Sequence, residues 1–404
     1  METKVSETEA KAGVAYHDYR LFLASCIALI ATAIIFAVRA DILSDLGKAF
    51  SLSPAQVGWV ICWAFWGFTI AIMIGGSLCD LLGMKAILGM AFVAHVAGTV
   101  LTIYAPGWLA LAAATLIIGL GSGFVEGGIN PLVATIYPDQ KTKKLNALHA
   151  WWPGGIVLGS LVSYLLSRLG QPWQVKMWII LIPTLLYGAL FLTLKLPKTE
   201  RVQSGVSTGQ MYKEMLRPLF LILLFCMLLT AATELGTNQW IGEIMKKSGI
   251  ESGILILAWI SAIMLIGRLF AGPVVEKLAP TGLLLASAVI SAIGLVFLSL
   301  ANSEPMAYVA SFVFALGICY FWPTMLGVTS ERFPKGGALL MGLMGAAGMA
   351  SAGFSQPLMG KLYQSFGPEG ALRYVAILPV VLVFIFGIIY LRDRARGGYK
   401  VEKL

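Results

Sequence analysis

The sequence predicts an all-α polytopic membrane protein, in which twelve transmembrane helices form two pseudo-symmetric six-helix bundles. Of its 404 residues, 58% are hydrophobic and 12% are charged, whereas soluble proteins carry about 25% charged residues. Uncharged apolar stretches such as 178–194 and 374–391 approach the length of a membrane-spanning helix. One long polar connection, 195–217, divides the chain into two halves. This composition excludes a conventional soluble enzyme and a disordered chain.

The individual spans end at charged loops and at loops that contain Pro or Gly. A helix needs about 20 apolar residues to cross the bilayer, and more when it is tilted. The polar stretch before Arg20 lacks the features of a cleaved signal peptide, so we expect the first span to be retained. The predicted spans lie near 20–46, 55–79, 85–104, 107–137, 146–168, 173–194, 218–244, 252–275, 281–302, 305–330, 337–363 and 370–391.

The distribution of basic residues predicts cytoplasmic termini. With the N-terminus inside, twenty of the 29 Lys and Arg residues lie on the cytoplasmic side and eight lie outside. This bias satisfies the positive-inside rule and explains the net charge of +9 without a nucleic-acid partner. We expect an integral protein of the cell membrane, either inner or plasma. Its expected parts are a cytoplasmic tail (1–19), an N-terminal bundle (20–194), a cytoplasmic linker (195–217), a C-terminal bundle (218–391) and a cytoplasmic tail (392–404).

A short motif after the second span has an echo at the end of the eighth span. The first copy covers 76–85 and the second covers 267–277, about half the chain apart. Glycines let two helices approach, and an acidic residue can cap a helix or pair with a cation. An ordinary tight cytoplasmic turn is the alternative interpretation. The residues assigned to this gating or structural motif are Gly76, Asp80, Gly83, Lys85, Arg268 and Glu276.

The two halves, the cytoplasmic termini and this Gly-x-Leu-x-Asp-x-x-Gly-x-Lys loop together resemble the major facilitator superfamily over the whole chain. Leu81 departs from the pattern, because the family usually has Arg or Lys there. The resemblance implies a two-bundle carrier whose halves rock around a site near the middle of the membrane.

A narrower stretch of the first half resembles the fucose–galactose–hexose permease branch of that superfamily. The similarity rests on 40–43 in the first span, on Glu-x-x-x-Asn-Pro at 126–131, and on Leu-Asn at 145–146. His149 stands where that branch commonly has Gln, and Trp152 stands where it commonly has Asn. The resemblance implies a proton-coupled or cation-coupled importer of a monosaccharide.

Ionisable side chains inside spans are costly and mark transport pathways or proton relays. Glu126, about 18 Å from the cytoplasmic end of its helix, is the main candidate for coupling to a proton or cation, with a packing hydrogen bond as the alternative. Asp41 is a second candidate, or else it forms a plain ion pair with Arg39 or Lys48 at the outer rim. Glu234 is the third. Because the seventh helix corresponds to the first, we expect its polar band to face Asp41 across the pore.

The predicted substrate site combines amides, which recognise hydroxyls, with aromatic faces, which stack on sugar C–H groups. For Trp151 and Trp152 the alternative is an interfacial anchor, and for the cluster that contains Tyr320 and Trp322 it is core packing. Pro131 either only kinks its helix or frees a carbonyl near Glu126 for a hydroxyl or an ion. The glycine-rich run 336–360 predicts a close helix–helix contact. The predicted substrate-binding residues are Asn130, Asn146, His149, Trp151, Trp152, Asn238, Gln239, Trp240, Tyr320, Trp322 and Gln356.

The sequence contains neither a phosphate-binding Gly-x-x-x-x-Gly-Lys-Ser/Thr loop nor a clustered His/Cys ligand set, so we expect no ATPase, no metalloenzyme and no cofactor beyond a coupling ion, H⁺ or Na⁺. The five cysteines fall in apolar segments and are expected to act as small hydrophobic residues. The predicted function is secondary active import of a hexose-like sugar by cation symport, with a proton favoured. The alternative is a proton-driven drug or metabolite exporter; a membrane enzyme or scaffold fits the repeated halves poorly. We expect a monomer whose partners are the sugar and the lipid bilayer, with no nucleic acid.

Overall fold

The computed structural model describes residues 2–137, 144, 147–197, 213–250, 253–333 and 337–402, and every regular element within these ranges is a helix. The first half contains eight described helices and the second half contains nine, one of them a π-helix. Those of the first half are α1 (Glu2–Asp41), α2 (Leu43–Ala49), α3 (Pro54–Leu82), α4 (Met84–Ile103), α5 (Trp108–Ile136), α7 (Trp151–Arg168), α8 (Trp173–Ile179) and α9 (Leu181–Thr193). Those of the second half are α12 (Pro218–Ala231), the π-helix η2 (Ala232–Gly236), α13 (Thr237–Lys247), α14 (Gly253–Leu269), α15 (Ala271–Ser299), α16 (Glu304–Ile318), α17 (Phe321–Arg332), α18 (Gly337–Val375) and α19 (Ile377–Ala395).

The helices account for twelve spans in the described part of the chain, as the sequence predicts. Ten stretches are long and apolar enough to cross a membrane. One of them, Gly342–Ala395, bends at Gly367, whose φ of 71° ends one helix before Pro368 begins the next. The seventeen-residue helix Gly253–Leu269 supplies the remaining span.

Local sequence explains where several helices begin and end. Ser53 and Gln56 form a capping box at the start of α3, with Pro54 in the first turn, where its missing N–H costs nothing. Gly83 joins α3 to α4 with a φ of 82°, a conformation that favours glycine. The eighth span ends at Leu269 rather than near 275, and the following segment turns at Ala279 (φ 55°), the residue before Pro280.

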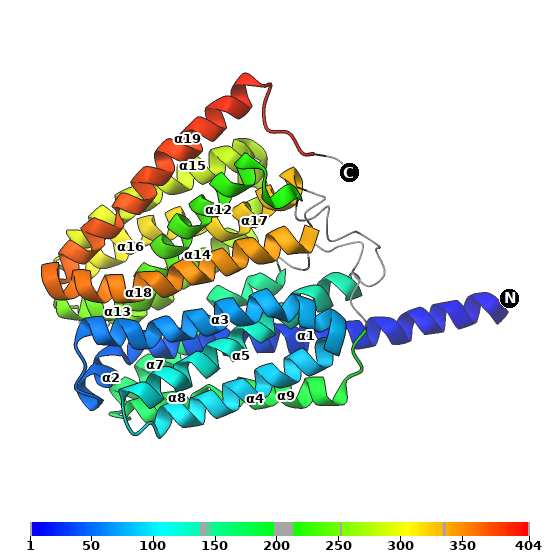
Figure 1. Cartoon of the computed structure of the whole chain (residues 1–404), viewed down its shortest axis with the longest axis horizontal. Coiled ribbons are helices and arrows are strands. Elements are labelled where there is room, and N and C mark those ends of the chain that lie inside the picture. The colour runs from blue at the N-terminus through cyan, green and yellow to red at the C-terminus, as the bar shows by residue number, and fades with distance from the viewer. Residues whose placement is uncertain are drawn as a thin grey trace.

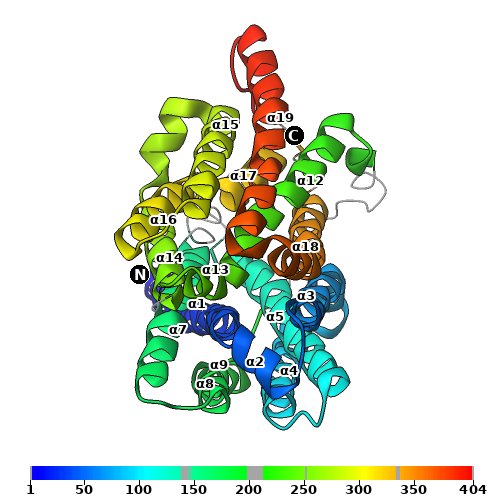
Figure 2. The same ribbon diagram turned by 90° about the vertical axis from the view of Figure 1, so that its left-hand side faces the viewer.

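The two halves form separate bundles that meet along one interface. In Figure 1 the bundle from α1 to α9 lies below and the bundle from α12 to α19 lies above, with both termini at the same end. Figure 2 looks along the molecule and places α3 beside α18, and α1 beside α13. Helices α7 and α14 also pack together across the interface. An even number of spans requires both termini to lie on one side of a membrane.

Close backbone contact between α3 and α18 joins the halves. A Cβ atom at Gly58 would meet the backbone of Gln356 and Pro357, and one at Gly360 would meet the backbone of Pro54. The predicted close contact of the glycine-rich run is therefore confirmed for its described residues. A shared apolar core extends the contact, since Phe36 and Phe65 belong to the same buried cluster as Met227 and Trp240.

The predicted C-terminal tail folds back onto the second bundle. Arg217 Nη2 lies 2.6 Å from Glu402 Oε1, and the Tyr399 hydroxyl donates to Glu331 Oε2 at 2.6 Å. Arg332 pairs with Asp393 at 2.7 Å. The hydrogen bond to Glu402 raises the pKa of the Arg217 guanidinium above its ordinary value. These contacts tie the start of α12, the end of α17 and the tail together.

Candidate substrate and coupling site

Three predicted site residues of the first half form a chain of hydrogen bonds. Glu126 on α5 is 6% exposed, and Asn130, one turn later, donates from Nδ2 to Glu126 Oε2 at 3.5 Å. Asn130 Oδ1 faces His149 Nε2 at 3.0 Å. Because the Asn130 amide already donates to Glu126, its oxygen is the acceptor and His149 Nε2 carries the proton. In the described part of the chain no cation lies within ion-pair distance of Glu126.

The carbonyl that Pro131 leaves unpaired is that of Gly127, four residues earlier. It accepts a contact from Cys79 Sγ at 3.4 Å. One of the two alternatives for Pro131 was a carbonyl free to receive a substrate hydroxyl or an ion, but here a thiol from α3 contacts that carbonyl. The carbonyl that Pro131 frees is therefore a contact point between α5 and α3.

Asp41 lies at the end of α1 and bonds within its own half. Lys176 Nζ on α8 lies 2.6 Å from Asp41 Oδ2, and the Ser163 hydroxyl on α7 donates to the same oxygen at 2.6 Å. The ion pair is buried, with 5% of the Lys176 side chain and 12% of the Asp41 side chain exposed. Asp41 is therefore ion-paired, as one of the two alternatives has it, but its partner is Lys176 from another helix and not Arg39 or Lys48.

Arg39, two residues earlier, makes the contact across the halves that we expected of Asp41. Its Nε and Nη2 atoms donate to Gln239 Oε1 at 3.0 and 2.9 Å. Its guanidinium also lies over the Phe65 ring, 4.9 Å from the centroid. The polar band of the seventh span thus faces Arg39. Arg39 and Lys176 were not among the predicted site residues, although both fall inside predicted spans, and a cation within a span is a signal that could have found them.

Glu234 lies in the π-helix η2, which interrupts the seventh span. It is 4% exposed and pairs with Arg268 at 3.4 Å. Arg268 also donates from Nε to the Cys319 carbonyl at 3.0 Å, and it lies within electrostatic range of His149. Arg268 was predicted as part of the gating or structural motif, and in the structure it joins α14 to η2 inside the bundle. A π-turn is often found at functional sites.

The polar residues that follow on α13, Asn238, Gln239 and Trp240, differ in whether their side-chain atoms are hydrogen-bonded. Trp240 Nε1 donates to Gln356 Oε1 on α18 at 3.0 Å, and the two residues are 2% and 0% exposed. The structure therefore pairs these predicted substrate residues with each other. By contrast, Asn238 Oδ1 and Gln239 Nε2 are buried and have no hydrogen-bond partner among the described residues.

The aromatic candidates occupy different surroundings. Trp151 is 44% exposed at the start of α7, which favours the anchor interpretation, whereas Trp152 packs on Phe36 with ring centroids 5.9 Å apart. The Tyr320 hydroxyl donates to the carbonyl of Gly267 at 3.1 Å. Trp322 packs against the glycine face of α18, where a Cβ atom at Gly348 would meet its ring at 2.6 Å.

The structure describes only part of the gating or structural motif that the sequence places at 76–85 and 267–277. Lys85 Nζ donates to the carbonyl oxygens of Leu192 and Leu194, at 2.8 and 3.3 Å, so it caps the C-terminal end of α9. Gly83 forms the turn itself. Asn146 and the side chains of Asp80 and Glu276 lie outside the described residues, and of Gly76 only its place within α3 is described.

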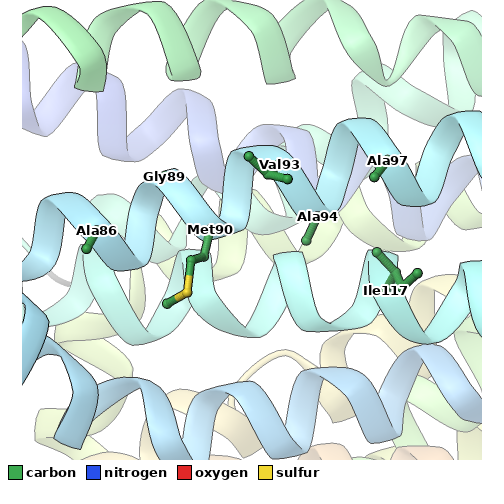
Figure 3. A pocket seen from close by; sticks show the side chains of 7 residues that line it. All are labelled: Ala86, Gly89, Met90, Val93, Ala94, Ala97 and Ile117. Atoms are coloured by element: carbon green, nitrogen blue, oxygen red, sulfur yellow. The ribbon is translucent and has the colours of Figure 1, made fainter.

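One groove lies away from all of these polar groups. It encloses about 540 Å³ between α4 and α5 and is lined only by apolar residues and a glycine, among them Gly89, Met90, Val93 and Ile117 (Figure 3). Val93 is 62% exposed within a membrane-spanning helix, so the groove faces lipid. It offers no group that would recognise a polar substrate.

The family model described as "Major Facilitator Superfamily" matches residues 21–338 and 240–403. Among curated relatives, the chain is 27% identical over 132 residues to the niacin transporter NiaP of Acinetobacter baylyi, and 26% identical over 234 residues to the gentisate transporter of Corynebacterium glutamicum. These alignments cover 31% and 54% of this chain, but only 29% and 51% of the two relatives. A monosaccharide-sensing protein of Arabidopsis thaliana is 27% identical over 41% of this chain and 22% of its own.

Solved structures share the fold over nearly the whole chain. The xylose transporter XylE from E. coli, in a partially occluded inward-open conformation, matches with a TM-score of 0.76 and 15% identity, over 92% of this chain and 98% of its own. The nucleoside transporter NupG matches with a TM-score of 0.77 and 13% identity, over 93% of this chain and 100% of its own.

Proposed function

The chain belongs to the major facilitator superfamily, and from this premise we propose that it imports a monosaccharide by cation symport, with a proton as the coupling ion. It is an integral membrane transporter and not an enzyme. Alternating access, in which the two bundles rock about the interface between them, is the mechanism that two such halves imply. Cytoplasmic termini are part of the proposal.

The observation that carries the proposal is the isolated carboxyl group of Glu126. It is buried, and its one hydrogen bond among the described residues is the long bond from Asn130. A buried carboxylate without a counter-ion is costly in a low-dielectric environment, so binding of a proton or cation there stabilises the site. Through Asn130 and His149 this carboxyl group connects to the interface near Arg268. Its protonation can therefore bias how the halves meet.

The polar groups near the interface support a hydroxylated substrate. Asn130, His149, Asn238 and Gln239 offer donors and acceptors, and Trp152 offers an aromatic face of the kind that stacks on a sugar ring. The resemblance to the hexose permease branch and the shared fold with a xylose transporter are consistent with this substrate class. The niacin and gentisate transporters among the relatives favour a second candidate, a small organic acid.

The test is uptake into proteoliposomes of labelled glucose, galactose, fucose and mannose, with a pH gradient and a sodium gradient imposed separately. Glu126→Gln is compared with the parent and with Glu304→Gln, which changes an exposed glutamate at the start of α16. We expect accumulation that follows the pH gradient, and we expect Glu126→Gln to equilibrate sugar without accumulating it, while Glu304→Gln behaves as the parent.

Full accumulation by Glu126→Gln would remove this residue from the coupling path. Accumulation driven only by the sodium gradient would replace the proton with Na⁺. If none of these neutral sugars enters under either gradient, the proposal of a neutral hexose as substrate fails. Efflux of a preloaded compound that is driven by an inward proton gradient would then favour the exporter.

A further inference from the structure

Arg39 is a membrane-embedded cation that has no carboxylate partner among the described residues. The other two described cations well inside the bundle are compensated, since Lys176 pairs with Asp41 at 2.6 Å and Arg268 pairs with Glu234 at 3.4 Å. Arg39 instead donates two hydrogen bonds to one neutral atom, Gln239 Oε1. An uncompensated charge at membrane depth indicates a functional site.

The guanidinium lies where the two halves meet. Arg39 belongs to α1, and the Phe65 ring on α3 lies 4.9 Å away, whereas Gln239 belongs to α13 of the other half. Gln239 precedes the end of α13 at Lys247 by eight residues, which is about 12 Å along the helix. The contact therefore lies below the membrane surface, between the elements that must separate during transport.

Two buried amide atoms beside this contact are unsatisfied. Gln239 Nε2 and Asn238 Oδ1 have no hydrogen-bond partner among the described residues, and the two residues are 0% and 2% exposed. A buried donor and a buried acceptor on neighbouring residues of one helix are each costly when they are unpaired. A ligand that brings an acceptor and a hydroxyl would satisfy both.

We propose that the transported molecule is an acid, whose carboxylate binds the Arg39 guanidinium in place of Gln239 Oε1. The two oxygens of a carboxylate match the parallel N–H groups of arginine, and such a charged pair is stronger than the bond to a neutral amide. The released Gln239 amide donates to the same ligand, and a neighbouring hydroxyl donates to Asn238 Oδ1. The inference rests on the proposed function, so the substrate class is a sugar acid, which carries both groups.

The test measures ligand-induced thermal stabilisation of the purified full-length protein in detergent, followed by counterflow in proteoliposomes. Each acid is matched with a neutral partner: galacturonate with galactose, gluconate with glucose, and benzoate with benzamide. The variants are Arg39→Gln, Arg39→Lys and the control Arg373→Gln. The Arg373 side chain is 57% exposed and pairs with Glu369 on the surface. We expect the parent and the control to prefer the sugar acids over the neutral sugars.

In Arg39→Gln this preference should fall by about ten- to a hundredfold, the range for a lost charged hydrogen bond, with Arg39→Lys in between. If Arg39 has only a structural role, its substitution should weaken the binding of acids and of their neutral partners to the same extent. If the parent binds neutral hexoses with the same affinity as the corresponding acids, the inference is overturned and the monosaccharide proposal still stands. If the parent binds benzoate but not the sugar acids, the carboxylate site is supported and the assignment of a sugar acid as substrate is overturned. Binding of none would overturn both, and the preference of the parent decides the matter even if Arg39→Gln does not fold.

Discussion

Lys176 and Asp41 form a buried ion pair between α8 and α1, with 2.6 Å between Nζ and Oδ2. Ser163 donates to the same carboxylate oxygen, so three helices of the first bundle meet at one atom. Removing one member of a buried pair is more costly than removing both, because the remaining charge keeps its desolvation penalty.

Lys176→Met should therefore destabilise the protein by about 3–5 kcal/mol, whereas the double variant Asp41→Asn with Lys176→Met should recover most of that loss. All five cysteines are buried, so a thiol-reactive dye reports thermal unfolding. Equal stability of the single and double variants would contradict a charge-pair role. If the double variant also transports normally, Asp41 is not a coupling residue.

The contact between Glu234 and Arg268 predicts energetic coupling between η2 and α14. We expect a double-mutant cycle with Glu234→Gln and Arg268→Gln to give an interaction energy of about 0.5–3 kcal/mol. Thermal unfolding and uptake are both measured. Additive effects in both measurements would show that the 3.4 Å contact contributes nothing.

Gly58 and Gly89 form a matched pair for testing the interface of the halves. A Cβ atom at Gly58 would collide with the backbone of Gln356, while one at Gly89, in the lipid-facing groove, would meet nothing within 4 Å. We expect Gly58→Ala to destabilise by about 1–3 kcal/mol and to impair transport, and Gly89→Ala to do neither. Similar behaviour of the two variants would argue against tight closure between α3 and α18.

His149 supplies the next prediction through its bond to Asn130. A glutamine can still donate to Asn130 Oδ1, so His149→Gln should keep substrate affinity and pH dependence close to those of the parent. His149→Phe cannot donate, and the loss of one neutral hydrogen bond should weaken affinity by about two- to tenfold. Loss of proton coupling in His149→Gln, with binding retained, would instead identify His149 as a titrating coupler.

The contrast between Glu126 and Arg39 shows how far the sequence reaches. Glu126 and Asn130 are one helical turn apart, and helical spacing alone predicts their contact. The partners of Arg39 and Asp41 lie 200 and 135 residues away, so their pairing depends on how helices rotate and pack. The same holds for Trp240 and Gln356, which bond to each other across α13 and α18.

The seventh span illustrates a second limit. Glu234 and Asn238 are four residues apart, which in a regular α-helix places them on one face. The π-turn Ala232–Gly236 inserts a wider turn at Glu234, so that spacing no longer fixes the faces. The number of spans was predictable because hydropathy and length determine it, and the division into two halves was predictable from the polar linker 195–217 and the repeated motif.

The folded-back tail has a practical consequence for anyone who labels this protein. Tyr399 contacts Glu331, and Glu402 contacts Arg217. A fluorescent protein fused directly after Leu404 would therefore be attached close to the point where the tail is held against the bundle. We expect the fused domain to interfere with the contacts that the tail makes at the start of α12 and the end of α17. Poor expression of such a fusion would then reflect the fusion and not the stability of the transporter itself. A long flexible spacer avoids the problem.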